Sequence, residues 1–201
     1  MGKQGILLVF SGPSGVGKGS ICRALLKEDP AIRLSVSATT RLPRNGEVHG
    51  ADYYFLDDET FRKMILGNEL LEWAEVYGHL YGTPRLSLQE TLDQGDDVIL
   101  EIDIQGALQV KRQFPLAVLI FVLPPSRLAL ESRLTTRGTD TREEIKKRLG
   151  NIKCELEMAC HYDYIVVNDE VARALNTVRA IIIAEKARYR RNRCWIEGLG
   201  C

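Results

Sequence analysis

One stretch of the sequence, residues 12–20, has residue types and spacing suited to binding phosphate. It reads Gly-Pro-Ser-Gly-Val-Gly-Lys-Gly-Ser. Glycines let a backbone curl until its N–H groups point at phosphate oxygens, and the lysine supplies a mobile cation. The sequence therefore predicts a nucleotide phosphate loop made of Gly12, Pro13, Ser14, Gly15, Val16, Gly17, Lys18, Gly19 and Ser20.

The loop departs from the usual pattern at the position that follows the lysine. A Ser or Thr normally stands there and binds Mg²⁺. Here Gly19 occupies that place and Ser20 comes next. We therefore expect Mg²⁺ to be held by Ser20 or through water molecules.

A phosphate loop needs a strand before it and a helix after it, and the sequence predicts both. Residues 6–10 are a continuous apolar run, typical of a strand buried on both faces, and residues 18–27 have helical periodicity. Further apolar runs alternate with helical stretches, which predicts an α/β fold with a mostly parallel sheet. The additional predicted strands are residues 32–36, 98–102, 116–123 and 164–167.

Two segments differ from this alternating pattern. Residues 37–83 are rich in turn residues and tyrosine, and they contain a short helix that Asp57 or Asp58 caps. Residues 127–159 form two charged helical stretches broken at Gly138. We predict one domain over 1–201, with its core at about 1–36, 84–126 and 160–201, an inserted lobe at 37–83 and a helical lid at 127–159.

Composition excludes several classes of protein. Lys+Arg and Asp+Glu are both 27, so no overall positive field favours nucleic acid or an anionic membrane. The longest apolar run, residues 117–123, is far shorter than the roughly 20 residues of a membrane helix. The five cysteines show no CxxC pair, which favours reduced thiols. We expect a cytoplasmic protein, and nothing in these residues sets an oligomeric state.

Beyond the loop, a series of motifs in one order resembles the guanylate kinase family over nearly the whole chain. The motifs are residues 35–47 (Ser-Val-Ser-Ala-Thr-Thr-Arg-Leu-Pro-Arg-Asn-Gly-Glu), Asp52-Tyr53, Leu71-Glu72-Trp73, Tyr81-Gly82-Thr83, residues 100–106, Arg137-Gly138-Thr139 and Val167-Asn168-Asp169. The resemblance implies a three-layer α/β P-loop kinase fold whose inserted lobe binds GMP. It also implies transfer of the ATP γ-phosphate to GMP, with ATP as donor, Mg²⁺ as cofactor, and these small molecules as the partners.

The resemblance assigns the GMP phosphate to Arg41 and Arg44, because arginine presents a planar fork that matches phosphate oxygens. Tyr53 and Tyr81 would donate phenolic O–H groups to the same anion. Without the resemblance, the arginines read equally well as solvated loop charges and the tyrosines as core residues.

Glu72 is the residue expected to recognise the base. Guanine presents two donors on one edge, N1–H and its exocyclic amine, and a carboxylate accepts both. Ser37 and Thr83 match family positions that donate to guanine O6. The alternative for Glu72 is a surface carboxylate beside Trp73.

Glu101 and Asp103 end the predicted strand 98–102, at the edge where open α/β sheets bind ligands. They could hold magnesium waters, or the ribose or base of the substrate, or only cap a helix. The family often has Asp at the position of Glu101.

The remaining assignments concern the ATP side and the lid. Arg133 and Arg137, four residues apart, and Arg148 would neutralise the transferring phosphoryl group, and Asn168 would lie near the adenine of ATP. The resemblance gives catalytic roles to Lys18, Arg41, Arg137 and Arg148. A solvated basic face is the alternative for the lid arginines.

Two other functions compete with an enzyme of this kind. Guanylate-kinase-like domains also occur as non-catalytic binding modules, often with an eroded phosphate loop, whereas Gly15, Gly17 and Lys18 are all present here. A kinase for another small phosphorylated substrate is the second alternative, and Glu72 together with Ser37 argues against it.

Overall fold

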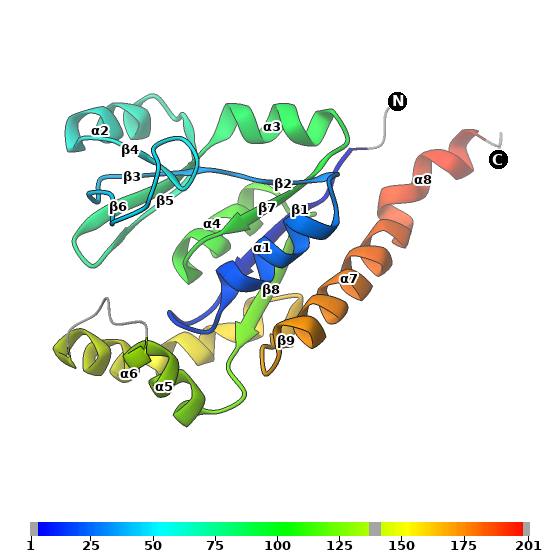
Figure 1. Ribbon diagram of the computed structural model, residues 1–201. Coiled ribbons are helices and arrows are strands. Elements are labelled where there is room, and N and C mark those ends of the chain that lie inside the picture. The colour runs from blue at the N-terminus through cyan, green and yellow to red at the C-terminus, as the bar shows by residue number, and fades with distance from the viewer. Residues whose placement is uncertain (1–3, 137–141, 199–201) are drawn as a thin grey trace.

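A five-stranded sheet forms the middle of the molecule in the computed structural model, which describes residues 4–136 and 142–198 (Figure 1). Its strand order is β2-β7-β1-β8-β9, and every neighbouring pair is parallel. The strands are β1 (Leu7–Ser11), β2 (Ile32–Leu34), β7 (Asp97–Glu101), β8 (Val118–Leu123) and β9 (Tyr164–Val167).

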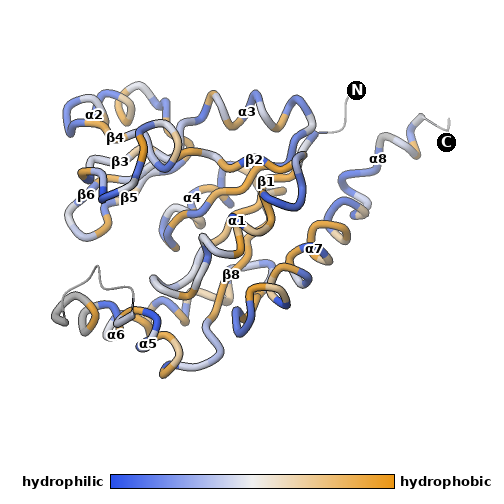
Figure 2. Tube along the Cα trace, in the orientation of Figure 1, coloured by the Kyte–Doolittle hydropathy of each residue, from blue (hydrophilic) through white to orange (hydrophobic). Residues whose placement is uncertain are grey.

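Helices cover both faces of this sheet, as the apolar strands require. Along β1, Leu7 and Val9 pack with α3 (Arg85–Asp93) and α4 (Ile104–Gln113). Leu8 and Phe10 face the opposite way, toward α1 (Lys18–Glu28) and α7 (Val171–Ala187), because side chains alternate along a strand. Hydrophobic residues are concentrated along β1 and β8 (Figure 2). The predicted α/β fold with a parallel core sheet is confirmed.

A second sheet, ordered β4-β3-β6-β5, lies in the segment predicted as an inserted lobe. Helix α2 (Asp58–Leu66) covers one of its faces, where Phe61 packs against Ala38 and Leu80. Asp57 caps this helix by accepting a 2.6 Å hydrogen bond from the Thr60 N–H. The strands are β3 (Ser37–Thr39), β4 (Tyr53–Phe55), β5 (Leu70–Val76) and β6 (His79–Pro84).

The segment predicted as a lid contains α5 (Arg127–Thr136) and α6 (Arg142–Glu157), followed by the 3-10 turn η1 (Met158–His161). Arg137 and Gly138, both singled out from the sequence, lie outside the described residues. The last element of the described residues is α8 (Tyr189–Gly198), which continues from α7 past the core sheet (Figure 1).

One predicted boundary is wrong. Residues 32–36 form no single strand, because β2 ends at Leu34 and the chain passes to the second sheet, where β3 begins at Ser37. Pro84 ends β6 and is the N-cap residue of α3. Helix α4 starts at Ile104, where the Asp103 side chain accepts a 2.7 Å hydrogen bond from the Gly106 N–H.

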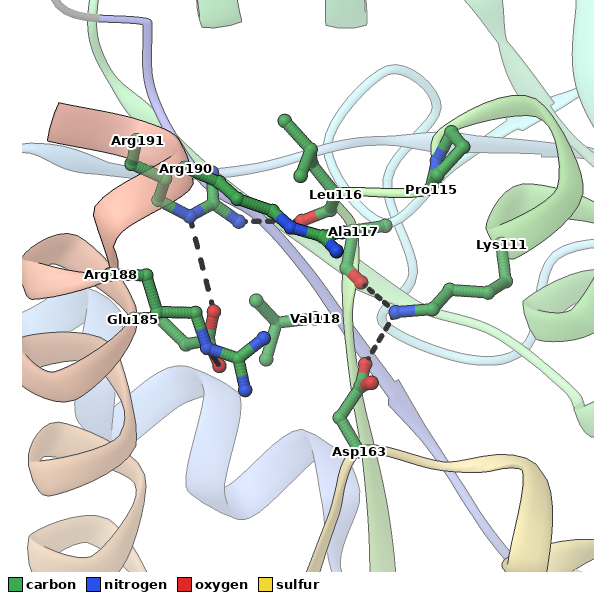
Figure 3. Close-up of a pocket in the computed structure, with 10 residues that line it drawn as sticks. All are labelled: Lys111, Pro115, Leu116, Ala117, Val118, Asp163, Glu185, Arg188, Arg190 and Arg191. Carbon is green, nitrogen blue, oxygen red and sulfur yellow. Dashed lines mark hydrogen bonds and ion pairs between the residues drawn. The ribbon is translucent and has the colours of Figure 1, made fainter. Parts of the chain in front are cut away.

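Figure 3 shows a pocket where α7 and α8 meet the start of β8. Its charged groups pair with one another: Glu185 with Arg188 and Arg191, and Lys111 with Asp163 at 2.7 Å. The buried Glu185 also accepts a 2.6 Å hydrogen bond from the Tyr164 hydroxyl. These contacts fasten the carboxyl-terminal helices to the sheet, at the strand ends opposite the phosphate loop.

Among the described helices, none combines the length and the apolar character needed to cross a membrane.

Candidate active site

The phosphate loop connects β1 to α1, and its glycines are required by backbone conformation and by close neighbours. Gly12 and Gly17 have φ of 132° and 93°, in the region that favours glycine. A Cβ at Gly12 would collide with the Val122 carbonyl, and one at Gly17 with the Asn168 side chain. No side chain caps α1 at Gly17, so its first N–H groups stay available for an anion.

Lys18 folds back over this loop. Its Nζ donates to the Gly12 carbonyl at 2.7 Å and to the Pro13 carbonyl at 3.2 Å. Burial lowers the pKa of Lys18, while the nearby carboxylate of Glu101 acts in the opposite direction. The cation is therefore held inside the curl of backbone N–H groups, where phosphate oxygens would bind.

Arg133 and Asn168 support the loop from behind. The Asn168 amide donates to the Val16 carbonyl at 2.8 Å. The Arg133 guanidinium donates to the same carbonyl at 3.1 Å and to the Asn168 carbonyl at 2.8 Å. Both residues hold the backbone of the loop in this structure, and their predicted contacts with ATP stay predictions.

The second sheet brings the residues expected to recognise the base into one row. Tyr53 pairs with Ser37, Ala38 with Gly82, and Glu72 with Thr83. This register places Ser37 beside Thr83, so the row runs Tyr53, Ser37, Thr83, Glu72 across four strands. Ala38 and its neighbours on the other face pack under α2, which leaves the row on the opposite face.

Glu72 is buried, with 4% of its surface exposed. Its Oε1 accepts a 2.7 Å hydrogen bond from the Thr83 hydroxyl, and its Oε2 lies against Gly106 of α4, where a Cβ would collide. Burial raises the pKa of Glu72 to about 7; Thr83 lowers it and the Asp103 carboxylate raises it. Glu72 is therefore held between the second sheet and the core.

Arg41 is held in place by Glu47, a residue to which the sequence reading gave no role. The guanidinium makes two hydrogen bonds of 2.9 Å to the two oxygens of Glu47. It also lies over the rings of Tyr53 and Phe55, at 5.4 Å and 5.7 Å from their centroids. Glu47 accepts a third bond, of 2.7 Å, from the Arg44 N–H, so one carboxylate organises both arginines.

Tyr53 and Tyr81 meet edge to face beside this pair, with their ring centroids 6.0 Å apart. Burial raises the pKa of Tyr53 to about 12, and the Glu101 carboxylate acts in the same direction. Tyr53 therefore stays protonated and can donate to a phosphate. Since the Glu101 carboxylate affects the pKa of Tyr53, the end of β7 faces this tyrosine.

The two core carboxylates lie where parallel strands end. A side chain at Gly19 would begin 3.2 Å from the Glu101 carboxylate, and Asp103 caps α4. Burial raises the pKa of Asp103. Among the described residues, no three His, Cys, Asp or Glu side chains form a metal-binding group. Mg²⁺ often keeps several waters and binds one or two carboxylates plus phosphates, so Glu101, next to Gly19 at the start of α1, fits such a cation.

The lid contributes a cation and a carboxylate to the same region. Arg148 of α6 donates to the Ser14 hydroxyl in the phosphate loop, and it lies over the Tyr77 ring. Glu155, also of α6, is half-buried and interacts electrostatically with Lys18, Arg148 and Asp103, and burial raises its pKa. Nothing in the sequence distinguishes Glu155 from the other charges of this helix.

Comparison with known proteins places these features in one family. The family profile described as guanylate kinase matches residues 4–185. A guanylate kinase of Caldanaerobacter subterraneus subsp. tengcongensis is 53% identical over 95% of this chain and 93% of its own. A guanylate kinase of Desulfitobacterium hafniense is 50% identical over 98% of both chains.

A solved structure is similar as well. The crystal structure of guanylate kinase from Anaplasma phagocytophilum superposes with a TM-score of 0.78 at 34% identity, covering 95% of this chain and 91% of that one. The family profile, the sequence relatives and this structure agree over nearly the full length. The chain belongs to the guanylate kinase family.

Proposed function

We propose that this protein transfers the γ-phosphate of ATP to GMP, giving ADP and GDP. The observation that carries the proposal is the row of Ser37, Thr83 and the buried Glu72, which ends against the core that carries the phosphate loop. A carboxylate matches the two donors of guanine and the Ser37 hydroxyl can donate to its carbonyl oxygen, while Thr83 holds the carboxylate by donating to Oε1. Identity of about half over the whole length of the relatives supports the same activity.

In this proposal the reaction is a direct transfer between bound nucleotides. A phosphate oxygen of GMP attacks the γ-phosphorus of ATP, and the bond to the β-phosphate oxygen breaks. Arg41, Arg44, Tyr53 and Tyr81 hold the GMP phosphate, while the loop N–H groups and Lys18 hold the ATP phosphates. Mg²⁺, when bound near Ser20 and Glu101, supplies positive charge to the phosphate oxygens. Positioning and charge neutralisation then account for catalysis, without a covalent intermediate.

The lid completes the proposed site. Arg148 already contacts the phosphate loop through Ser14, so a small movement of α6 brings its charge onto the transferring group. Arg137 is proposed to act beside it. We propose the functional division that the sequence suggested: a core, a GMP-binding lobe at about 37–83 and a lid at about 127–159, in a protein that works in the cytoplasm.

The test of this function is ADP release, measured with ATP, Mg²⁺ and each nucleoside monophosphate in turn. We expect turnover with GMP to exceed that with AMP, CMP or UMP by orders of magnitude. Activity at background with GMP would exclude the proposal. A preference for another monophosphate would favour the alternative of a kinase for a different substrate.

GMP binding is expected to weaken as the pH falls below about 7, the pKa to which burial raises Glu72. Below that pH the empty protein carries a protonated Glu72, which no longer accepts from both guanine donors. Binding must then release a proton, so Kd should rise by about tenfold for each pH unit below the pKa. Isothermal titration calorimetry across this range measures both Kd and the proton release.

The matched control for this pH profile is Glu72→Gln. The phosphate of GMP also titrates, with a second pKa of about 6, and the variant keeps that contribution while losing the carboxyl group. The dependence of Kd on pH should therefore be steeper in the wild type than in Glu72→Gln. Parallel slopes in the two proteins would contradict the assignment.

Replacing Glu47 with glutamine is expected to raise KM for GMP by about tenfold while kcat changes little. The substitution removes the charge that pairs with Arg41 through two 2.9 Å bonds, and a charged hydrogen bond contributes about 1.5–3 kcal/mol. Arg41 then loses its fixed orientation before the phosphate arrives. Steady-state kinetics at varied GMP concentration measures the effect.

Glu59→Gln is the control for the Glu47 variant. Glu59 pairs with Lys63 on the exposed side of α2, where an ion pair stabilises the protein little. Its kinetics should match the wild type. If Glu47→Gln also left KM unchanged, Glu47 would have no part in orienting Arg41.

A further inference from the structure

The turn between β5 and β6 contains a residue type that is disfavoured in the backbone conformation found there. Tyr77 and Gly78 form this turn, with φ of 53° and 81°. A two-residue turn with both φ values positive favours Asn-Gly, because a bulky side chain clashes with its own backbone there. In the described residues the other non-glycine with positive φ is Asn68, a type that tolerates it. A tyrosine in this place therefore points to a function for its ring.

The ring of Tyr77 contacts the lid. The guanidinium carbon of Arg148 lies 5.1 Å from the ring centroid, within the range of a cation–π interaction. The same guanidinium donates to Ser14 in the phosphate loop. One side chain of α6 therefore touches both the tip of the second sheet and the loop that is expected to hold ATP. Figure 1 shows the β5–β6 hairpin reaching toward α6.

We propose that Tyr77 is a positioning residue for the transfer reaction: its ring holds Arg148 at the phosphate loop, so that closing of the GMP lobe and closing of the lid occur together. The inference rests on the proposed function. Tyr77 lies at the hairpin tip, beyond the row that contains Glu72 and Thr83, and acts on the reaction through Arg148.

Glu155 explains why Arg148 needs this second contact. The half-buried carboxylate attracts Arg148 along the same helix and also attracts Lys18. In the proposed arrangement the ring opposes this attraction, together with the Ser14 hydroxyl to which the guanidinium donates. The ring adds attraction on the side of the GMP lobe, and that attraction exists only when hairpin and lid are close.

The experiment compares Tyr77→Leu, which removes the π face, with Tyr77→Phe, which keeps it. We expect kcat to fall by about tenfold in the leucine variant, because a cation–π contact is lost. KM for GMP should be unchanged. The phenylalanine variant should retain wild-type kcat. Tyr77→Asn should lose activity like leucine while its melting temperature rises, since asparagine fits the turn. Tyr189→Leu, an exposed tyrosine on α8, is the control.

A double-mutant cycle decides whether the effect passes through Arg148. In an Arg148→Ala background, Tyr77→Leu should have no further effect on kcat. An undiminished effect there, or wild-type kcat in Tyr77→Leu, would overturn the proposal. Failure of the proposed function is recognised separately, because the wild type would then release no ADP with GMP.

A binding measurement tests the same coupling without turnover. The probe is a compound in which five phosphates join adenosine to guanosine, so that it occupies both nucleotide sites at once. Tyr77→Leu should weaken its binding by about tenfold, with GMP alone and ATP alone bound as in the wild type. Equal binding of the joined compound by both proteins would exclude coupling between lobe and lid through this ring.

Discussion

Replacing Lys18 with alanine is expected to lower kcat on the order of 10³-fold, because the developing charge of the transferring phosphoryl group loses a preorganised cation. The Nζ of Lys18 lies within the curl of the phosphate loop, bonded to the carbonyls of Gly12 and Pro13. Those carbonyls fix the amine before the nucleotide binds, so little reorganisation is required during the reaction. Steady-state kinetics with ATP and GMP measures the loss.

The same substitution is expected to leave the melting temperature unchanged or higher. Burial lowers the pKa of Lys18, which means that the empty protein disfavours its charged form. Removing the charge relieves that cost, as is common at sites where function and stability conflict. Lys27→Ala, on the exposed last turn of the same helix, is the control and should change neither quantity. Near-normal turnover in Lys18→Ala would contradict the assignment.

The shape of the glycine-rich loop and the closeness of Glu72 and Thr83 follow from short-range sequence, whereas the roles proposed for these residues stay predictions. Three glycines before Lys18 specify a curled backbone, and the apolar run before them specifies the strand that positions it. Glu72 and Thr83 stand on adjoining strands, so their meeting at 2.7 Å follows once the β5–β6 hairpin forms. In such cases residue type, spacing and local structure all point to one arrangement.

The partners of the arginines were not predictable in the same way. Glu47 was visible in the motif that carries Arg41, but pairing six residues away depends on how the loop folds. The contact of Tyr77 with Arg148 joins two segments 71 residues apart in sequence (148 − 77). Glu155 sits among alternating charges on α6, a pattern that most often means a solvated helix face.

Arg133 illustrates a different limit of sequence reasoning. Its place on the predicted lid suggested a role at the phosphates, which stays a prediction, whereas the hydrogen bonds of its guanidinium to the Val16 and Asn168 carbonyls could not be predicted. Sequence periodicity predicts which residues share one face of a helix. It does not predict which part of the protein packs against that face. The end of β2 at Leu34 has the same origin, since the chain leaves the core sheet there and enters the second sheet at Ser37, which only the tertiary fold determines.

Replacing Glu72 with glutamine is expected to reduce kcat/KM for GMP by about 10²-fold or more. Glutamine keeps the size of the side chain but carries one acceptor oxygen. Because Thr83 donates to Oε1 at 2.7 Å, the amide oxygen should take that position and leave its NH₂ group in place of Oε2. Guanine then loses a charged hydrogen bond and faces an unpaired donor, and each of these costs about 1.5–3 kcal/mol.

For AMP the change should run in the opposite direction, which makes the ratio of the two substrates diagnostic. Adenine presents an acceptor at N1 and carries its amine at C6, so the NH₂ group of glutamine can donate to N1, where the carboxylate of Glu72 could only repel it. Turnover with AMP should stay low, since the hydroxyl of Ser37 remains placed to donate to a carbonyl oxygen at C6, which adenine lacks.

The quantity to measure is therefore the GMP/AMP ratio of kcat/KM, in the wild type, Glu72→Gln and the control Glu75→Gln. Glu75 lies on the same strand but is exposed and faces the other way, so its variant should keep the wild-type ratio. A folded Glu72→Gln is expected, because removing a buried charge whose pKa is raised to about 7 relieves a desolvation cost above that pH. If the ratio stays at the wild-type value in this folded protein, base recognition belongs to Glu101 or Asp103, the other carboxylates close to the second sheet.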